Sequence, residues 1–248
     1  RAPQNEIDPI FDEFGFEYAT AGRIADQSGL DRMNEICRIK GRAGVGLLSA
    51  LPVIDKRYGL PGLAEDVDSG RWIEADVKTP QGYTVTVVCV YVHAGNTDDP
   101  EKMKQKYRFL DTMLVRMGQL RDEAAHGGKQ AVLCGDFNIA HTPLDIKNAK
   151  ANEKHAGFLP EERAYVDKWL GELEFVDVMR SLCGDIQGPY TWWSQRGRAF
   201  DNNVGWRIDY QFATPELAET ARGFVIDKAP TYDLRWSDHA PLSITYDV

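Results

Sequence analysis

The chain has 248 residues and a formal net charge of −9, because 38 aspartates and glutamates outnumber 29 lysines and arginines. Its 43% hydrophobic and 27% charged residues are typical of a chain that buries a core, which excludes disordered and fibrous classes. There is no run of about 18 apolar residues, so we expect no membrane-spanning segment and no membrane partner. The four cysteines are widely spaced without a Cys-x-x-Cys motif, which favours reduced thiols in a cytoplasmic compartment over zinc ligands.

The first half of the chain predicts strands followed by one long helix. Residues 44–51 and 71–77 predict short strands, the second with alternating apolar and polar side chains. Residues 83–92 are almost entirely β-branched, as in a strand covered on both faces. From Pro100 to about Arg121, apolar residues recur at spacings of four and three and predict an amphipathic helix. They are Met103, Tyr107, Leu110, Leu114 and Met117.

The second half continues the mixture of strands and helices. Residues 131–134 predict a short buried strand, and Pro160 followed by two glutamates predicts the start of a helix. Further strands are expected at 191–193, 206–212 and 240–246. Strands interspersed with helices, without a repeat or a linker, predict one α/β unit.

Asp136 and Asn138 directly follow the buried strand at 131–134. Residues two apart in an extended chain point the same way, so their oxygens suit one hard cation such as Mg²⁺. The alternative interpretation is an Asx turn that closes the strand.

Three further strand ends carry polar groups. Alternation places Asp209 on the same face as Arg207, so either a functional role or an ion pair to Arg207 explains this acid. Asp238 and His239 precede the last strand, where either a ligand site or a capped turn is expected. Tyr91 ends the β-branched strand and, taken alone, is interpreted as a half-buried tyrosine. Together these groups indicate a site at one rim of a sheet, and oxygen donors favour Mg²⁺ or Mn²⁺ over zinc.

Seven segments of the chain, in order, carry the motifs of one enzyme family. They are residues 44–49, 91–92, 135–140, 158–163, 191–193, 203–209 and 237–242. In these segments the chain resembles the exonuclease III family of DNA-repair nucleases, within the endonuclease/exonuclease/phosphatase superfamily. The resemblance implies a four-layer α/β sandwich, with two mixed β-sheets packed face to face and outer helices, as a single domain over residues 1–248.

The resemblance also implies an activity and the residues that perform it. The implied activity is metal-dependent hydrolysis of DNA in base-excision repair, by incision 5′ to abasic sites and by 3′ to 5′ degradation of duplex ends. The implied catalytic residues are Tyr91, Asp136, Asn138, Asp209 and His239. The implied ligands of Mg²⁺ or Mn²⁺ are Asp136, Asn138, Asp238 and His239.

Trp192, Trp206 and Ile208 match positions that line the family's pocket for a flipped-out abasic sugar, although core packing is the alternative for such residues. Arg196 and Arg198 lie beside these tryptophans and are the first candidates for phosphate contact, since a negative net charge still allows a local basic face. Another candidate, the run Lys102, Lys104, Lys106 and Arg108, has a solvated helix face as its alternative. The expected partner is duplex DNA with abasic sites or 3′ ends, bound by a monomer.

The sequence departs from the family at its start. The family's first two strands end in an asparagine and in a metal-binding glutamate, ahead of a segment like Arg1-Ala2-Pro3, and neither residue is present here. We therefore expect the native protein to carry a further strand, helix and strand, and expect poor metal binding without them. This departure keeps open the alternative of a non-catalytic nucleic-acid-binding relative. A lipid or nucleotide phosphatase is a third hypothesis, which Trp206 argues against.

Overall fold

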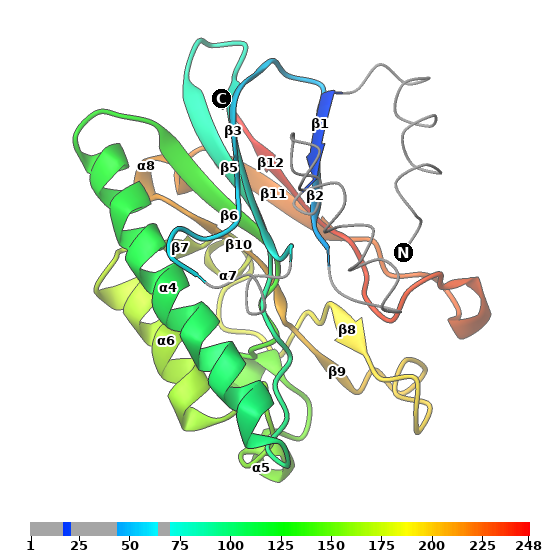
Figure 1. The fold of residues 1–248 in the computed structure, drawn as a ribbon. Coiled ribbons are helices and arrows are strands. Elements are labelled where there is room, and N and C mark those ends of the chain that lie inside the picture. Colours follow the sequence, from blue (N-terminus) through cyan, green and yellow to red (C-terminus); the bar gives the residue numbers. More distant parts are fainter. Residues whose placement is uncertain (1–16, 21–43, 64–69) are drawn as a thin grey trace.

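The computed structural model describes residues 17–20, 44–63 and 70–248 (Figure 1). Its strands are β1 (Glu17–Thr20), β2 (Gly46–Ser49), β3 (Val53–Tyr58), β4 (Trp72–Lys78), β5 (Thr84–Tyr91), β6 (Gln130–Asp136), β7 (Val176–Asp177), β8 (Trp192–Trp193), β9 (Gly205–Trp206), β10 (Asp209–Ala213), β11 (Ala221–Ile226) and β12 (Leu242–Tyr246). Its helices are α4 (Pro100–Ala125), α5 (Ala149–Asn152), α6 (Pro160–Gly171), α7 (Val178–Cys183) and α8 (Pro215–Ala218). Within these residues, no helix is long and apolar enough to cross a membrane.

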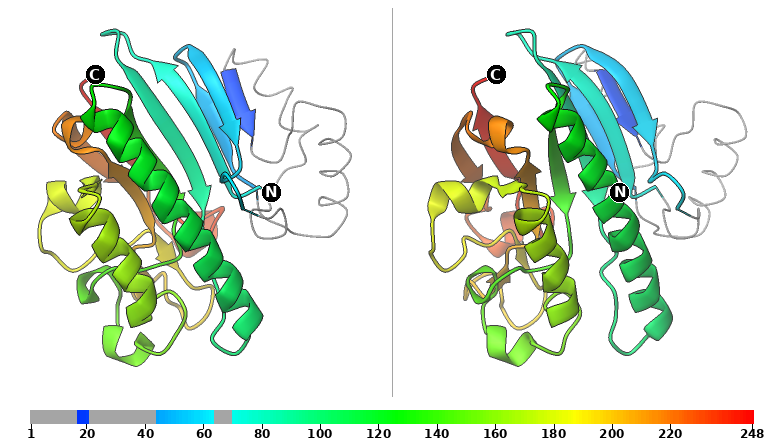
Figure 2. Two further views of the ribbon diagram at one scale, coloured as in Figure 1. Left: turned by 60° about the vertical axis from the view of Figure 1, so that its left-hand side comes forward. Right: turned by 90° about the vertical axis from the view of Figure 1, so that its left-hand side faces the viewer.

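Six strands form a mixed sheet in the order β3-β4-β5-β6-β10-β7. Neighbours are antiparallel except for β5 and β6, which run parallel. Parallel neighbours need a crossover connection, and α4 provides it between these two strands. Figure 2 shows α4 and α6 side by side on one face of this sheet.

The helix α4 begins where the sequence predicts and buries a stripe that is shifted from the predicted one. Asp99 caps the helix by accepting a hydrogen bond from the backbone N–H of Lys102. Leu110 and Met117 are buried as expected, but Phe109 and Met113 replace Tyr107 and Leu114 at the centre of the stripe. The prediction was therefore right for the helix, and Tyr107 and Leu114 pack against the core while they remain only partly buried. This stripe packs on the sheet together with Val166 and Trp169 of α6.

Two strand pairs cover the other face of the sheet. Leu47 of β2 packs against Ile73 and Ala75 of β4, and Ile244 and Tyr246 of β12 belong to a second cluster on the same side. The β1–β2 and β11–β12 pairs thus lie opposite the helices (Figures 1 and 2). The expected α/β fold, in which strand layers pack face to face beneath helices, is confirmed.

The strand predicted at 71–77 is confirmed as β4, and its polar side chains are buried as well as its apolar ones. Glu74 and Asp76 are buried because Arg57 donates to both acids, at 2.7 Å in each case. Arg116 also donates to Glu74, and Lys129 pairs with Asp76. Burial by itself raises the pKa of Asp76, but hydrogen bonds from Arg57 and Lys129 outweigh it and hold that pKa at about 2.

Candidate active site

Three of the expected catalytic residues lie in one row across the middle of the sheet. Tyr91 is in register with Asp136 in the parallel β5–β6 pair, and Asp136 is in register with Asp209 in the antiparallel β6–β10 pair. Residues directly opposite each other point to the same face of a sheet. Cys134 and Ala213, which share that face by alternation, contact the cluster on the β12 side. Strand register therefore assembles the expected site on the face turned away from the helices.

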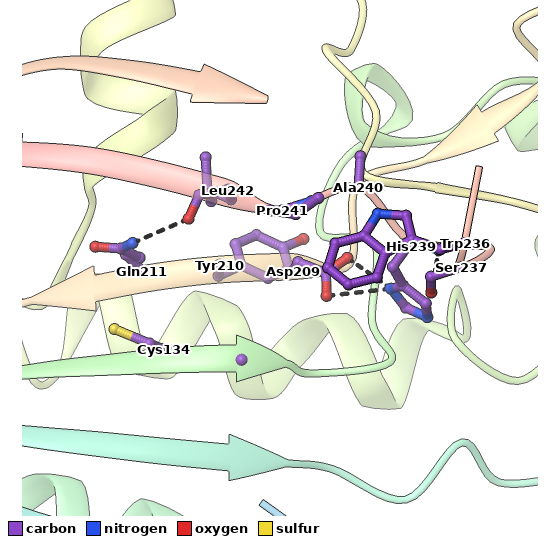
Figure 3. A pocket seen from close by; sticks show the side chains of 11 residues that line it. Cys134, Asp209, Tyr210, Gln211, Trp236, Ser237, His239, Ala240, Pro241 and Leu242 are labelled. Carbon is purple, nitrogen blue, oxygen red and sulfur yellow. Dashed lines mark hydrogen bonds and ion pairs between the residues drawn. The ribbon is translucent and has the colours of Figure 1, made fainter. Parts of the chain in front are cut away.

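His239 reaches this row from the entry to β12 (Figure 3). Its Nδ1 lies 2.9 Å from Oδ2 of Asp209, and its Nε2 lies 3.9 Å from Oδ2 of Asp136. Burial by itself lowers the pKa of the imidazole, but the hydrogen bond to Asp209 and the charges of both acids outweigh it and raise the pKa of His239 to about 9. The ring is therefore positively charged at neutral pH.

The turn after β6 holds Asp136 and Asn138 together. Phe137 between them is fully buried in the core on the helix side, so its two neighbours point elsewhere. The carboxylate of Asp136 accepts hydrogen bonds from the backbone N–H of Asn138 at 2.8 Å and from its side-chain amide at 2.9 Å. Asn138 has a φ of 50°, a left-handed conformation that asparagine tolerates. The Asx turn is thus present, and it brings the two side chains together.

The environment of Asp136 disfavours its charged form. Burial, and then the charge of Asp209 directly opposite, raise the pKa of Asp136 to about 7, although His239 acts in the other direction. A positive charge placed next to Asp136 would remove this penalty, and this is the electrostatic situation that a bound cation satisfies.

A buried ion pair, not identified from the sequence, supports the same turn. Nζ of Lys106 on α4 donates to the backbone carbonyls of Asn138 at 2.9 Å and of Ala94 at 3.1 Å. It also lies 2.5 Å from Oε1 of Glu162 on α6, and both side chains are fully buried. The expectation of a basic or solvated face is wrong for Lys106, because it lies in the buried stripe of α4 one turn before Phe109 and Leu110.

The strand predicted at 206–212 is interrupted at Arg207 and Ile208, between β9 and β10. Arg207 is fully buried and donates to Asp145 and Asp177, at 2.7 Å in each case. The break in the strand therefore coincides with a buried arginine. The same contacts decide whether Asp209 forms an ion pair with Arg207. Arg207 pairs with other acids, and the partner of Asp209 is His239.

The three expected pocket residues meet beside His239. Ile208 is buried in a small cluster with Trp192 and Trp206, whose indoles contact each other edge to face at 5.9 Å between centroids. The ring of Trp192 lies 6.5 Å from the ring of His239. Gly157 has a φ of +94°, and a Cβ on it would approach the indole of Trp206 to 3.0 Å, so only glycine fits easily beneath this ring.

The remaining predicted residues are less closely joined to the row. Oδ2 of Asp238 accepts a hydrogen bond from Nε1 of Trp192 at 3.0 Å. Arg196 and Arg198 are exposed in the loop that follows Trp193. Nε of Arg198 lies 3.4 Å from Oδ2 of Asp201 in an exposed ion pair.

The metal ligands implied by the resemblance are brought only partly together. In the described part of the chain, no group of three or more histidine, cysteine, aspartate or glutamate side chains is arranged to hold a metal. Asp209 occupies Nδ1 of His239, and Trp192 occupies one oxygen of Asp238. Asp136 fits a hard cation best, since His239, Asn138 and Lys106 offset the cost of its charged form only in part.

Comparison with known proteins identifies the family of the chain. Residues 11–239 match the endonuclease/exonuclease/phosphatase family. The exodeoxyribonuclease of Bacillus subtilis (strain 168) is 32% identical over 209 residues, which cover 84% of this chain and 76% of that protein. A DNA-(apurinic or apyrimidinic site) endonuclease of Dictyostelium discoideum is 31% identical, with 84% of this chain and 54% of that protein covered.

A solved structure supports the same assignment. The AP endonuclease from Archaeoglobus fulgidus matches with a TM-score of 0.74 and 28% identity, covering 98% of this chain and 94% of that one. The resemblance found in the seven sequence motifs is thereby confirmed. The chain belongs to the endonuclease/exonuclease/phosphatase family, in the group of exodeoxyribonucleases and AP endonucleases, which are divalent-metal-dependent nucleases.

Proposed function

We propose that this protein is a DNA-repair nuclease that hydrolyses phosphodiester bonds at the row Tyr91, Asp136 and Asp209, with His239 above it. The observation that carries the proposal is the contact of His239 with both acids, at 2.9 and 3.9 Å. The positively charged ring can donate a hydrogen bond to an anionic phosphate oxygen, and a carboxylate beside it can accept a proton.

The proposed roles follow from the charge states of the two groups. His239, with a pKa of about 9, is charged at neutral pH and is suited to donate a hydrogen bond to the scissile phosphate. Asp136, with a pKa of about 7, is suited to accept a proton from the attacking water. Asp209 keeps the imidazole charged and oriented, as an acid does for histidine in other hydrolytic sites. Asn138 orients Asp136, because its side-chain amide donates to that carboxylate and to the backbone carbonyl of Val92, at 2.9 Å in each case.

We propose Mg²⁺, or Mn²⁺ in its place, as the metal, held by Asp136 and Asn138 with Asp238 and His239 nearby. Such an ion supplies Lewis-acid stabilisation of the negative charge that builds on the phosphate oxygens. Mg²⁺ commonly keeps several waters and binds substrate phosphates, which suits a site with few protein ligands.

The proposed substrate is duplex DNA with an abasic site or a 3′ end. Trp192, Trp206 and Ile208 form an apolar cluster beside His239, and we propose that this cluster lines the pocket for a sugar that lacks its base. The exposed Arg196 and Arg198 next to this pocket are the proposed phosphate contacts.

We also propose a monomer that works in the cytoplasm. One chain brings Asp136, Asp209 and His239 into contact, so no second chain is needed to form the row. The free thiols of Cys89 and Cys134 are consistent with a reducing compartment. Light scattering after size exclusion tests the monomer directly.

Cleavage of two labelled duplexes tests the proposed function. One carries a single tetrahydrofuran abasic analogue, and the other has an intact recessed 3′ end. We expect incision 5′ to the analogue and shortening of the 3′ end with Mg²⁺, and neither reaction with EDTA. The Trp206→Ala variant should lose more activity on the abasic duplex than on the 3′ end, because Trp206 lines the pocket.

The alternative, a non-catalytic nucleic-acid-binding relative, is not favoured, because the similar proteins are nucleases and the acids contact His239. DNA binding without metal-dependent cleavage, by folded wild-type protein, would favour that alternative and overturn the proposal.

A further inference from the structure

One large aromatic side chain beside the proposed active site has no role in the proposed hydrolysis. Trp236 is 91% exposed, the largest exposed fraction among the large hydrophobic side chains of the described residues. It lies three residues before His239, in the segment that enters β12. Isolated exposed hydrophobic residues are common on proteins, so its exposure alone carries no conclusion.

The position of Trp236 is informative because it borders the active site. A cavity of about 300 Å³ is lined by Trp236 together with Asp209 and His239, and its wall continues along β10 and β12 (Figure 3). Trp192 of the apolar pocket also lies beside His239, at 6.5 Å between ring centroids, and does not line this cavity. The imidazole therefore borders two aromatic environments, the pocket with Trp192 and the cavity with Trp236.

The backbone on both sides of Trp236 is fixed. The guanidinium of Arg235 stacks on the ring of Tyr232 at 4.1 Å and donates to the carbonyl of Trp193 at 3.3 Å. On the other side, the carbonyl of Asp238 accepts from the N–H of Trp193, and Ala240 donates to Thr191. The indole is thus an exposed group on a backbone segment that is anchored before a ligand arrives.

We propose that Trp236 is a stacking surface for a base of the DNA strand that is being cut, next to the scissile bond at His239. This inference rests on the proposed function, since a phosphodiester at His239 has a nucleoside on each side. Successive nucleotides rise by about 3.4 Å along one strand, so a base that flanks the scissile bond is within reach of the rim of this cavity. Aromatic side chains stack on any of the four bases, which suits a nuclease that acts without regard to sequence.

The test compares Trp236→Ala and Trp236→Phe with the wild type on hairpin duplexes that have one 3′ end. Single-turnover cleavage with Mg²⁺ gives the protein concentration at half-maximal rate. In matched hairpins, one nucleotide near the scissile bond lacks its base. Only the product shortened at the 3′ end is scored, because incision at the missing base is the separate abasic-site reaction. Leu234→Ala is the control, because Leu234 is 64% exposed in the same segment but does not line the cavity.

On intact DNA we expect the half-maximal concentration to rise about 5- to 150-fold for Trp236→Ala, as base–aromatic stacking predicts, and to change less than about 2-fold for Trp236→Phe and for Leu234→Ala. When the stacked base is absent, Trp236→Ala should cause no further loss. The inference is overturned if Trp236→Ala behaves as the wild type on intact DNA, or if its loss is the same on every base-deleted hairpin.

Failure of the proposed function would look different. In that case the wild type leaves all hairpins uncut with Mg²⁺. The same comparison, made as binding affinity in EDTA, then decides whether Trp236 stacks on DNA, because the expected dependence on one base is unchanged.

Discussion

The substitution Asp209→Asn tests the electrostatic arrangement at its centre. Asp209 lies 2.9 Å from Nδ1 of His239 and is directly opposite Asp136 in the sheet. The variant keeps the size of the side chain but removes the charge that holds the imidazole protonated. We expect the pKa of His239 to fall from about 9 toward or below its ordinary 6.5, because burial then acts with less opposition.

The stability effect depends on pH in a defined direction. A histidine whose pKa is raised in the folded state contributes stability below its unfolded pKa of 6.5 and loses that contribution as the pH rises through about 9. A pKa of about 9 against 6.5 corresponds to roughly 3 kcal/mol. Because the side chain is 30% exposed and Asp136 also favours the charged ring, we expect the variant to lose about 1–2 kcal/mol at pH 6.

At pH 10 the difference in stability between the wild type and Asp209→Asn should disappear or reverse. The ring is then neutral in both proteins, and the variant no longer opposes two carboxylates across β6 and β10. Urea unfolding in EDTA at pH 6, 8 and 10 measures the difference. Proton NMR titration follows His239 among the five histidines of the chain, with His239→Gln as the assignment control. Equal destabilisation at pH 6 and pH 10, or an unchanged pKa of His239, would refute the reasoning.

Three further predictions use other parts of the structure. Lys106→Met should lower the free energy of unfolding by about 3–5 kcal/mol in chemical denaturation, since it leaves Glu162 buried and unpaired. The double variant with Glu162→Gln should recover part of this loss, and no recovery would contradict the pairing. Arg207→Leu should lower stability by a similar ~3–5 kcal/mol, whereas Arg222→Leu, which removes an exposed ion pair, should change it by less than about 0.5 kcal/mol. Equal effects of the two substitutions would refute the role of burial. Mg²⁺ binding should tighten as the pH rises through about 7, because Asp136 must release its proton. Calorimetry in buffers of different ionisation enthalpy should detect that release, and an affinity for Mg²⁺ that does not change with pH would contradict the prediction.

The sequence predicted the positions of the site better than the contacts that hold it. Asp136 and His239 were identifiable because polar residues at the ends of apolar strands point to one rim of a sheet. Their pairing depends on strand register, which places Asp136 opposite Asp209 and cannot be obtained from the alternation of either strand alone.

The errors have a common physical cause in buried charges. Lys106 and Arg207 look like surface residues in a sequence, and both are fully buried because acids from distant segments satisfy them. Glu74 in β4 is buried for the same reason. Local periodicity contains no information about a partner that lies more than fifty residues away, such as Glu162 for Lys106 or Asp145 for Arg207.

The proposed roles of Asp136 and His239 in phosphodiester hydrolysis can be tested by measuring cleavage and binding separately. The measurement is the single-turnover rate of DNA cleavage with Mg²⁺ for the wild type, Asp136→Asn and His239→Gln, with the dissociation constant for the same DNA measured in EDTA. We expect the rate to fall at least about 100-fold in each variant, as loss of an acid–base group does, while the dissociation constant changes by less than about 3-fold. Cleavage by either variant at the wild-type rate would contradict the account.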